Sequence, residues 1–509
     1  EIPAQEIIPS LNEEGSRRQS GCLLFQKEIP MEQRIYRIVL STLLGAAVFA
    51  FWMWLFPQAL NYQEQNQLFL FTWDYLGERL ALPGGGADWL SEFLVQFFYY
   101  SFTGALVMAL LAVLLQLAVW RAARSVGREG ERGAYVLSFI PSLLLIIYMG
   151  DVEVLVSYPV ALLGAAALCP LFVKAGRHRL WLIPLGWWLI GPAIAVPVLV
   201  SCLDGRKPFD WALLAYTALV FWAGHRILSP QYPPRDAWFG LNYYRLVETL
   251  PALQIVIPLV SVLCIFCCSL PWEVRHPAVT GSILAALLAA GTAWGVHTAY
   301  DKDTYETLAY DYLIRHGRYQ EVISRAEKYQ PHNRVSACSV NFCLFMNGEL
   351  LSRMDRFYQC GTEGLVLPSI RDNLSDITSA EVLWMMGMPN ITLQYYFDLQ
   401  ESIQNGRKSG RFLSRMAECN IVNGWDPRAE KYLDILRHSL FYRRWAMERK
   451  ADDPVYAYIR QVRFKDDFIT VYEALDLMMA VLYNQDRNNF MAAEYYTAWQ
   501  RLKQKEGAK

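Results

Sequence analysis

The chain changes character near Tyr300. Before this residue, apolar runs long enough to cross a lipid bilayer follow one another, separated by short charged segments. After it come about two hundred residues rich in lysine, arginine, aspartate and glutamate, with helical periodicity and no further run of that length. The sequence therefore predicts an all-α protein, in which a polytopic membrane domain is followed by a soluble helical domain.

About eight ranges are predicted to span the membrane as helices. They are residues 36–56, 99–120, 135–148, 152–173, 180–203, 211–227, 250–270 and 279–300. The fifth range contains Pro184, Pro192 and Pro197, and prolines free backbone groups that neighbours or water must satisfy. We therefore expect this helix to be kinked or broken, and we expect any error in the number of spans to occur here.

The predicted domain organisation has three parts. Residues 1–30 lack an apolar run of the kind found in signal peptides, so they are interpreted as a disordered polar leader. Met31 comes just before the first span and is a candidate for the true start. The membrane domain is placed at 31–299, with a long segment at 57–98 after the first span, and the helical domain at 300–509.

Basic residues are concentrated on one side of the predicted membrane domain. With eight crossings, that side holds Arg34, Arg37, Arg121, Arg124, Arg128, Arg132, Lys174, Arg177, Arg179, Arg226, Arg235 and Arg245, and the other holds Arg79, Arg206, Lys207 and Arg275. Because lysine and arginine accumulate in cytoplasmic loops, the richer side is predicted to be cytoplasmic. The predicted location is a bacterial inner membrane, with residues 57–98 exoplasmic and the C-terminal domain cytoplasmic.

The soluble half contains segments that are similar to tetratricopeptide repeats. In residues 316–331, Gly317 fits the turn between two helices and Pro331 the end of the second helix. Weaker units are expected at 341–358, 413–433 and 475–499. Stacked repeats form concave surfaces that suit a protein partner. An irregular helical bundle is the alternative interpretation.

Several acids on the predicted exoplasmic side are candidates for catalysis. Glu64 is the first acid after the first span, and a carboxylate at membrane depth must be paired, hydrated or functional. Gln67 lies on the same side of the predicted helix and is expected to orient Glu64. Asp151 and Glu153 occupy the next exoplasmic turn. A carboxylate in such a position can activate an acceptor hydroxyl as a general base.

Three cations on the same predicted side are candidates for binding a phosphate group, namely Arg206, Lys207 and Arg275. The alternative is that these loops are polar only because they are in contact with water. No metal site or cofactor is predicted, because the cysteines at 264, 267 and 268 lie in an apolar run and are interpreted as packing residues. The net charge of −1 gives no argument for binding nucleic acid.

The membrane half resembles the GT-C superfamily of glycosyltransferases, which use polyprenyl-phosphate-linked sugars. The likeness covers roughly residues 34–203: a first span, a long exoplasmic segment of amphipathic helices with an acid, and further spans. It implies that the catalytic acid is Glu64 or Asp74, and that the acid of the second loop is Asp151 or Glu153. It also implies a lipid partner, the polyprenyl-phosphate-linked donor.

Most of the chain also looks like an uncharacterised family of Bacteroidetes membrane proteins. The segments that carry this likeness are 64–70, 83–85 and 417–424. Two functions therefore stay open. One is a transferase that moves a sugar from a lipid carrier at the exoplasmic face. The other is a membrane-anchored scaffold whose helical repeats bind a partner protein.

Overall fold

The computed structural model describes residues 31–126, 132–203, 211–246, 248–270, 276–368, 373–464, 467 and 474–507. Within these residues every regular element is a helix, and the only β-type pairing is an isolated bridge between Val154 and Tyr244. The predicted all-α class is therefore confirmed. The chain forms two compact units, 1–43 and 44–509, and all contacts described below lie within the second.

Six helical segments in the described residues are long and apolar enough to cross a membrane. They are Met31–Leu55 (α2, Met31–Ala50, with η1, Phe51–Leu55), Ser101–Val126 (α6), Ser157–Lys174 (α9), Gly176–Leu203, Ala252–Ser269 (α14) and Ala278–Ala299 within α15 (Pro277–Ala299). Two other predicted spans correspond to shorter helices, namely α7 (Arg132–Leu137) with α8 (Ile140–Tyr148), and α12 (Ala212–Leu228). All eight predicted ranges contain helix, but length and composition support six spans.

The fifth predicted span consists of two helices. After η3 (Gly176–His178), α10 (Arg179–Ile190) and α11 (Ala195–Leu203) are joined by η4 (Gly191–Ile194). Gly191 has φ 61° and ψ −149°, a backbone conformation that is essentially restricted to glycine. The predicted break in this range is therefore present, and it is located at a glycine followed by Pro192.

The position of α12 shows that α11 runs back along α10. The start of α12 lies beside the start of α10, because the Tyr216 hydroxyl donates a hydrogen bond to the Leu180 carbonyl at 3.0 Å. Further along, α12 again lies beside α10, since a Cβ atom added to Gly224 would meet the Trp187 ring. Helices α10 and α12 thus run in the same direction, so the helix between them must run in the opposite one.

The segment after the first span, here called the first loop, folds into α3 (Pro57–Gln65), α4 (Trp73–Leu80), α5 (Gly85–Val95) and η2 (Gln96–Tyr99). Helices α4 and α5 are joined by a turn that contains Pro83 and Gly84. Gly84 closes the turn with φ 81°, and its N–H donates to the Trp188 carbonyl at 2.9 Å. Gly84 holds the N-cap position of α5, and Asp88 in the first turn of this helix pairs with Arg407.

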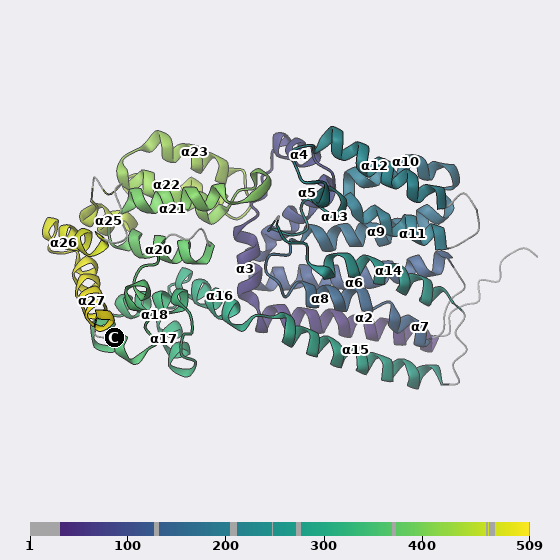
Figure 1. Cartoon of the computed structure of the whole chain (residues 1–509), viewed down its shortest axis with the longest axis horizontal. Helices are drawn as coiled ribbons and strands as arrows, with labels where there is room; N and C mark the ends of the chain where they lie inside the picture. Colours follow the sequence, from purple (N-terminus) through teal and green to yellow (C-terminus); the bar gives the residue numbers. More distant parts are fainter. Residues whose placement is uncertain are drawn as a thin grey trace, which may run out of the picture. The chain divides into compact units, whose positions relative to one another are not determined.

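Helix α15 leads directly into the C-terminal helices (Figure 1), with Asp301 as the N-cap of α16. The helices are α16 (Lys302–Arg315), α17 (Tyr319–Lys328), α18 (Arg334–Met346), α19 (Leu350–Arg353), α20 (Asn373–Met385), α21 (Pro389–Glu401), α22 (Gly410–Asn423), α23 (Asp426–Arg437), α24 (Arg443–Glu448), α25 (Ala457–Val462), α26 (Leu475–Gln485) and α27 (Phe490–Gly507). The first eight form four hairpins, each turning at a glycine with positive φ: Gly317, Gly348, Gly387 and Gly424.

The first loop packs against the C-terminal helices. The Leu68 N–H donates to the Lys408 carbonyl at 2.7 Å, and the Phe71 N–H donates to the His438 carbonyl at 2.9 Å. Apolar side chains of the loop also share one buried core with residues of α20 to α25. The first loop and the C-terminal helices therefore lie on the same side of any membrane that the spans cross. An exoplasmic loop combined with a cytoplasmic C-terminal domain, as predicted, is inconsistent with this packing.

A buried ionic cluster joins α4 and α5 to the C-terminal helices. Arg407 donates to Asp88 at 2.8 Å and to Glu92 at 2.7 Å, and all three side chains are almost completely buried. Arg79 lies 3.1 Å from Glu92 and donates to the Asn405 carbonyl at 2.8 Å. Two guanidinium groups thus face two carboxylates away from water. These charges are balanced only while the two parts of the chain stay packed together.

Candidate functional site

A cavity of about 390 Å³ lies between the end of the first loop and the C-terminal helices, and we call it the junction cavity. Its volume is in the range of small-molecule sites. Three arginines, two glutamates and a large set of aromatic rings dominate its lining. The lining residues are Tyr99, Ile314, Arg315, Tyr319, Phe342, Glu381, Trp384, Met385, Tyr396, Arg411, Ser414, Arg415, Glu418, Phe441, Tyr442 and Trp445.

Helix α22 supplies much of the charge in the junction cavity. Arg411, Arg415 and Glu418 follow one another at intervals of four and three residues, so they share one side of the helix. Arg415 donates to Glu418 at 2.7 Å and to Glu381 of α20, also at 2.7 Å. The side chains of Arg415, Glu381 and Glu418 are 20%, 16% and 17% exposed, so each is only partly covered by protein.

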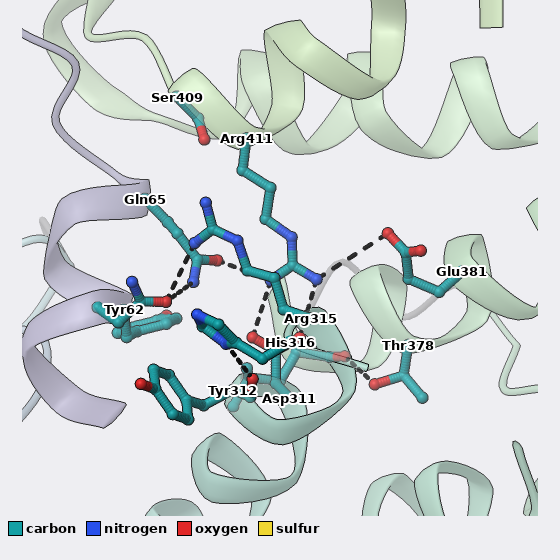
Figure 2. Close-up of polar contacts among 12 residues, drawn as sticks. Tyr62, Gln65, Asp311, Tyr312, Arg315, His316, Thr378, Glu381, Ser409 and Arg411 are labelled. Atoms are coloured by element: carbon teal, nitrogen blue, oxygen red, sulfur yellow. Dashed lines mark hydrogen bonds and ion pairs between the residues drawn. The ribbon is translucent and has the colours of Figure 1, made fainter. Parts of the chain in front are cut away.

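Arg411 and Arg315 are held by residues of the first loop (Figure 2). Arg411 donates to both carboxylate oxygens of Asp311, at 2.8 and 2.9 Å, and to the side chain of Gln65 at 2.9 Å. Arg315 donates to the side chain of Asn61 at 3.0 Å. Helix α3 therefore fixes two arginines that belong to the C-terminal helices, and the site is complete only when both parts of the chain are present.

The two glutamates of the junction cavity have pKa values shifted in opposite directions. Burial alone would raise the pKa of Glu381, but Arg415 and Arg411, together with the hydrogen bond from Tyr396, lower it below its ordinary value. Burial raises the pKa of Glu418, and the attraction of Arg415 offsets only part of this effect. Two carboxyl groups with separated pKa values can act one as a base and the other as an acid.

Glu64, the predicted catalytic base, lies behind the wall of the junction cavity. It is 3% exposed, accepts a hydrogen bond from the Tyr442 hydroxyl at 3.2 Å, and lies 3.9 Å from Arg315. Burial raises the pKa of Glu64 above its ordinary value, and the positive charge of Arg315 opposes this rise. Because Tyr442 and Arg315 line the cavity, Glu64 is coupled to it through these two side chains.

Asp151 and Glu153, the other two predicted acids, have partners of their own. The Tyr244 hydroxyl donates to Asp151 at 2.6 Å. Arg245 forms two bonds to Glu153, one of them at 2.8 Å, and also donates to the Tyr62 hydroxyl at 2.8 Å. Tyr62 lies two residues before Glu64, so the segments that carry the three acids are close together. Their carboxylates nevertheless bind different partners.

The backbone N–H of Gln67 donates to the Glu64 carbonyl at 3.2 Å, but the side chain of Gln67 does not bond to the Glu64 carboxylate as expected. This side chain donates to Gln63 at 3.3 Å, and Gln63 in turn donates to the carbonyls of Val152 and Val154 at 2.7 and 2.8 Å. These glutamines therefore hold α3 against the turn that carries Asp151 and Glu153. The three predicted phosphate ligands, Arg206, Lys207 and Arg275, lie outside the described residues.

The described residues contain no group of three or more histidine, cysteine, aspartate or glutamate side chains that could hold a metal ion. The cysteines at 264, 267 and 268 lie within α14, one of the apolar candidate spans. The junction cavity presents carboxylates, guanidinium groups and aromatic rings.

Sequence reasoning missed the residues of α22 that line the cavity. The available signal was the spacing of Arg411, Arg415 and Glu418 next to the apolar residues Phe412 and Met416. On an isolated helix, such a charged side is expected to face water. Here α20 and α3 cover it, and this covering depends on contacts between segments that are far apart in the sequence.

Replacing Glu64 with glutamine is expected to make the stability less dependent on pH. Since the pKa of Glu64 is raised by folding, its contribution to stability is complete below the ordinary value of 4.5 and is lost as pH rises through the folded pKa. Glutamine still accepts the bond from Tyr442 but does not titrate. The thermal midpoint of Glu64→Gln, compared with that of the wild type in detergent, should improve between about pH 5 and about pH 8.

Glu321→Gln is the matched control for this comparison. Glu321 is exposed, and its hydrogen bond with Arg318 lowers its pKa. The thermal midpoint of Glu321→Gln, compared with that of the wild type, should not improve as pH rises. The pKa of Glu321 is shifted in the opposite direction to that of Glu64, and solvent screens its pair with Arg318. If the thermal midpoints of Glu64→Gln and the wild type differ by the same amount at every pH, burial does not oppose ionisation of Glu64.

Comparison with known proteins assigns the chain to one family. No curated protein and no solved structure matches it significantly. The family described as "Family of unknown function (DUF6057)" matches residues 33–505, which include both the membrane helices and the C-terminal helices. This agrees with the predicted membership of an uncharacterised family. The chain thus belongs to the DUF6057 family of unknown function.

Proposed function

We propose that the protein acts on a sugar-bearing, negatively charged ligand at the exoplasmic face of a bacterial inner membrane, and that the junction cavity is its site. The composition of the cavity carries this proposal. The guanidinium groups of Arg315 and Arg415 suit a phosphate. The carboxylates of Glu381 and Glu418 can accept hydrogen bonds from sugar hydroxyls. The ring of Trp445 offers an apolar face on which a sugar can stack.

The path of the chain supports an exoplasmic position. Because α10 and α11 run in opposite directions, this pair returns to the side from which it started. The remaining helices contribute one crossing each for α2, α6, α7 with α8, α9, α12, α14 and α15, which makes seven. Six of these crossings come after the first loop, and an even number returns the chain to the side of that loop, against which the C-terminal helices pack.

The distribution of basic residues agrees with this topology. Arg226, Arg235 and Arg245 come after the reversal at Gly191 and lie on the side of the first loop, where Arg245 binds Glu153. Arg121, Arg124, Lys174, Arg177 and Arg179 stay on the side on which α6 ends. That side still holds more of the basic residues between the spans, so the positive-inside rule makes it cytoplasmic in this proposal and the C-terminal helices exoplasmic.

The proposed reaction is the transfer of a sugar from a polyprenyl-phosphate carrier to a hydroxyl group, as in the GT-C superfamily. The bond between the anomeric carbon and the phosphate oxygen breaks, and the carrier phosphate leaves with the bonding electrons. The acceptor hydroxyl forms the new bond and loses its proton to a carboxylate. Glu381 suits the role of base because its lowered pKa keeps it ionised. Arg315 and Arg415 would hold the departing phosphate.

The predicted acids take supporting roles in this proposal. Glu64 positions Tyr442 and Arg315 from behind the cavity wall. Asp151 and Glu153 fix the segment that follows α13 (Pro234–Phe239) through Tyr244 and Arg245. The acids would therefore affect the reaction through the shape of the site.

The experiment compares surface glycans of a deletion strain that carries wild-type protein, Glu381→Gln or Glu448→Gln. Loss of a general base typically lowers a rate about 10²- to 10⁴-fold, so Glu381→Gln should not restore the glycan. Glu448 is the matched control, because it is exposed on α24 and outside the cavity. Purified protein in nanodiscs should also bind a decaprenyl-phosphate-linked hexose, and Trp445→Ala should weaken this binding.

The outcomes separate the two candidate functions. If Glu381→Gln fully restores the glycan, the proposed base is wrong. If the deletion alters no glycan and the decaprenyl-phosphate-linked hexose does not bind, the transferase is excluded. A scaffold is then the better function, and the succession of four hairpins in the C-terminal helices favours it. In that case, Glu381→Gln should restore any phenotype of the deletion that depends on a partner protein.

A further inference from the structure

The segment between α23 and α24 carries an exposed leucine beside aromatic residues at the end of a membrane helix. Leu440 is 47% exposed. The ring of its neighbour Phe441 stacks on Tyr99, with centroids 5.3 Å apart, and meets the edge of Tyr100 at 5.5 Å. Tyr99 and Tyr100 come directly before Ser101, where the candidate span α6 begins.

Trp54 and Phe102 mark the level at which the spans leave the bilayer. Trp54 stands at the end of the first candidate span and Phe102 at the start of α6, and they are 72% and 57% exposed. Both rings contact Phe49, at centroid distances of 6.4 and 5.4 Å, so the two residues lie close to one level. Exposed aromatic residues at the ends of spans are typical of the membrane–water interface.

A series of ring contacts continues from Phe441 across the first loop. Phe441 contacts Phe97 at 6.0 Å, Phe97 contacts Phe93 at 5.7 Å, and Phe93 contacts Phe71 at 6.5 Å. Phe71 is 54% exposed, and Trp73, two residues later, is 86% exposed. Exposed apolar residues of the first loop and of the C-terminal helices are thus linked to the start of a membrane helix.

From this arrangement we propose that the C-terminal helices dock on the lipid bilayer through Leu440, which inserts at the boundary between headgroups and acyl chains beside Phe71, Trp73 and Tyr100. Single exposed apolar side chains are ordinary on protein surfaces. Leu440 differs because its neighbour Phe441 contacts Tyr99 and Tyr100, which come just before Phe102 at the start of α6. The partner is the lipid of the membrane that α6 crosses, since an aromatic and aliphatic edge at this level suits the interface.

This docking has a consequence for the junction cavity. Phe441 and Tyr442 line the cavity and directly follow Leu440. The wall that they form is therefore held at the membrane surface. The inference concerns the contact with lipid and does not depend on which ligand the cavity binds.

The test uses full-length protein in phosphatidylcholine nanodiscs, with an environment-sensitive fluorescent amino acid in place of Leu440. A phospholipid with a nitroxide close to the headgroup end of its acyl chain serves as the quencher. Quenching at position 440 should reach at least about half of that at position 106, where Leu106 is 44% exposed on α6. The same reporter at Tyr329, which is 58% exposed after α17, should not be quenched.

Each outcome decides the proposal. Quenching at 106 without quenching at 440 overturns it, and so does equal quenching at 440 and 329. If the fluorescent residue lowers the thermal midpoint, a nitroxide side chain at position 440 replaces it. The accessibility of this nitroxide to oxygen, which concentrates in lipid, is then compared with its accessibility to a water-soluble nickel chelate. Greater accessibility to oxygen supports insertion of position 440, and greater accessibility to the chelate overturns it. The readout needs no sugar ligand, so failure of the transferase proposal leaves this result interpretable.

Discussion

Arg407→Met is expected to lower the free energy of unfolding by about 3–5 kcal/mol, the usual cost of leaving a buried charge without its partner. Arg407 is 4% exposed and binds both Asp88 and Glu92. Its removal leaves these two carboxylates away from water, with Arg79 as the other cation of the cluster. The prediction is checked by measuring the thermal midpoint of the purified variant in detergent, which should be clearly lower than that of the wild type.

Two further variants separate this effect from a general loss of charge. Arg444→Met removes an exposed arginine that pairs with Glu448, and it should leave the midpoint unchanged, because exposed pairs contribute little. Adding Asp88→Asn to Arg407→Met should recover part of the loss, since one uncompensated charge disappears. If Arg407→Met behaves like Arg444→Met, the first loop is not packed on the C-terminal helices through this cluster.

A cysteine in place of Tyr329 is expected to react with a membrane-impermeant maleimide in intact cells whose outer membrane has been made permeable. Tyr329 is 58% exposed and belongs to the C-terminal helices, which the proposed topology assigns to the exoplasmic side. A cysteine in place of Arg124, at the end of α6, should stay unlabelled until the inner membrane is opened. Labelling should be nearly complete at position 329 and nearly absent at position 124, because the maleimide does not cross the membrane.

The labelling is done after replacement of the accessible native cysteines by serine. Reaction at 124 with protection at 329 would reverse the whole orientation and contradict the positive-inside assignment. Reaction at both positions, or at neither, would put the two sites on one side. The pair formed by α10 and α11 would then count as a single crossing, as the sequence predicted.

The membrane helices could be predicted because their cause is local. A bilayer leaves no water for the backbone, so each span must be a continuous apolar helix of sufficient length, and such runs are visible in the sequence. The ranges predicted around α6, α9, α14 and α15 all prove helical for this reason. The turn at Gly84 was also predictable, because glycine after proline signals a change of chain direction.

The direction of α11 could not be predicted in the same way. Gly191 and Pro192 permit a kink as well as a reversal, and local chemistry does not distinguish them. Two contacts, between Tyr216 and Leu180 and between Gly224 and Trp187, decide for the reversal, because together they place α12 parallel to α10. One reversal changes the side of every later segment. The predicted side of the C-terminal helices therefore depended on a contact that the sequence does not reveal.

The candidate site shows the same division. Hydropathy alone predicts an all-α chain of apolar helices followed by charged helices, and Glu64 is recognisable as a candidate because an acid beside a span is unusual in any fold. Only the tertiary structure decided that Tyr442 and Arg315 enclose Glu64, and that Arg415 joins Glu381 to Glu418. The physical reason is that burial, and with it the pKa of a carboxyl group, depends on segments brought together from distant parts of the chain.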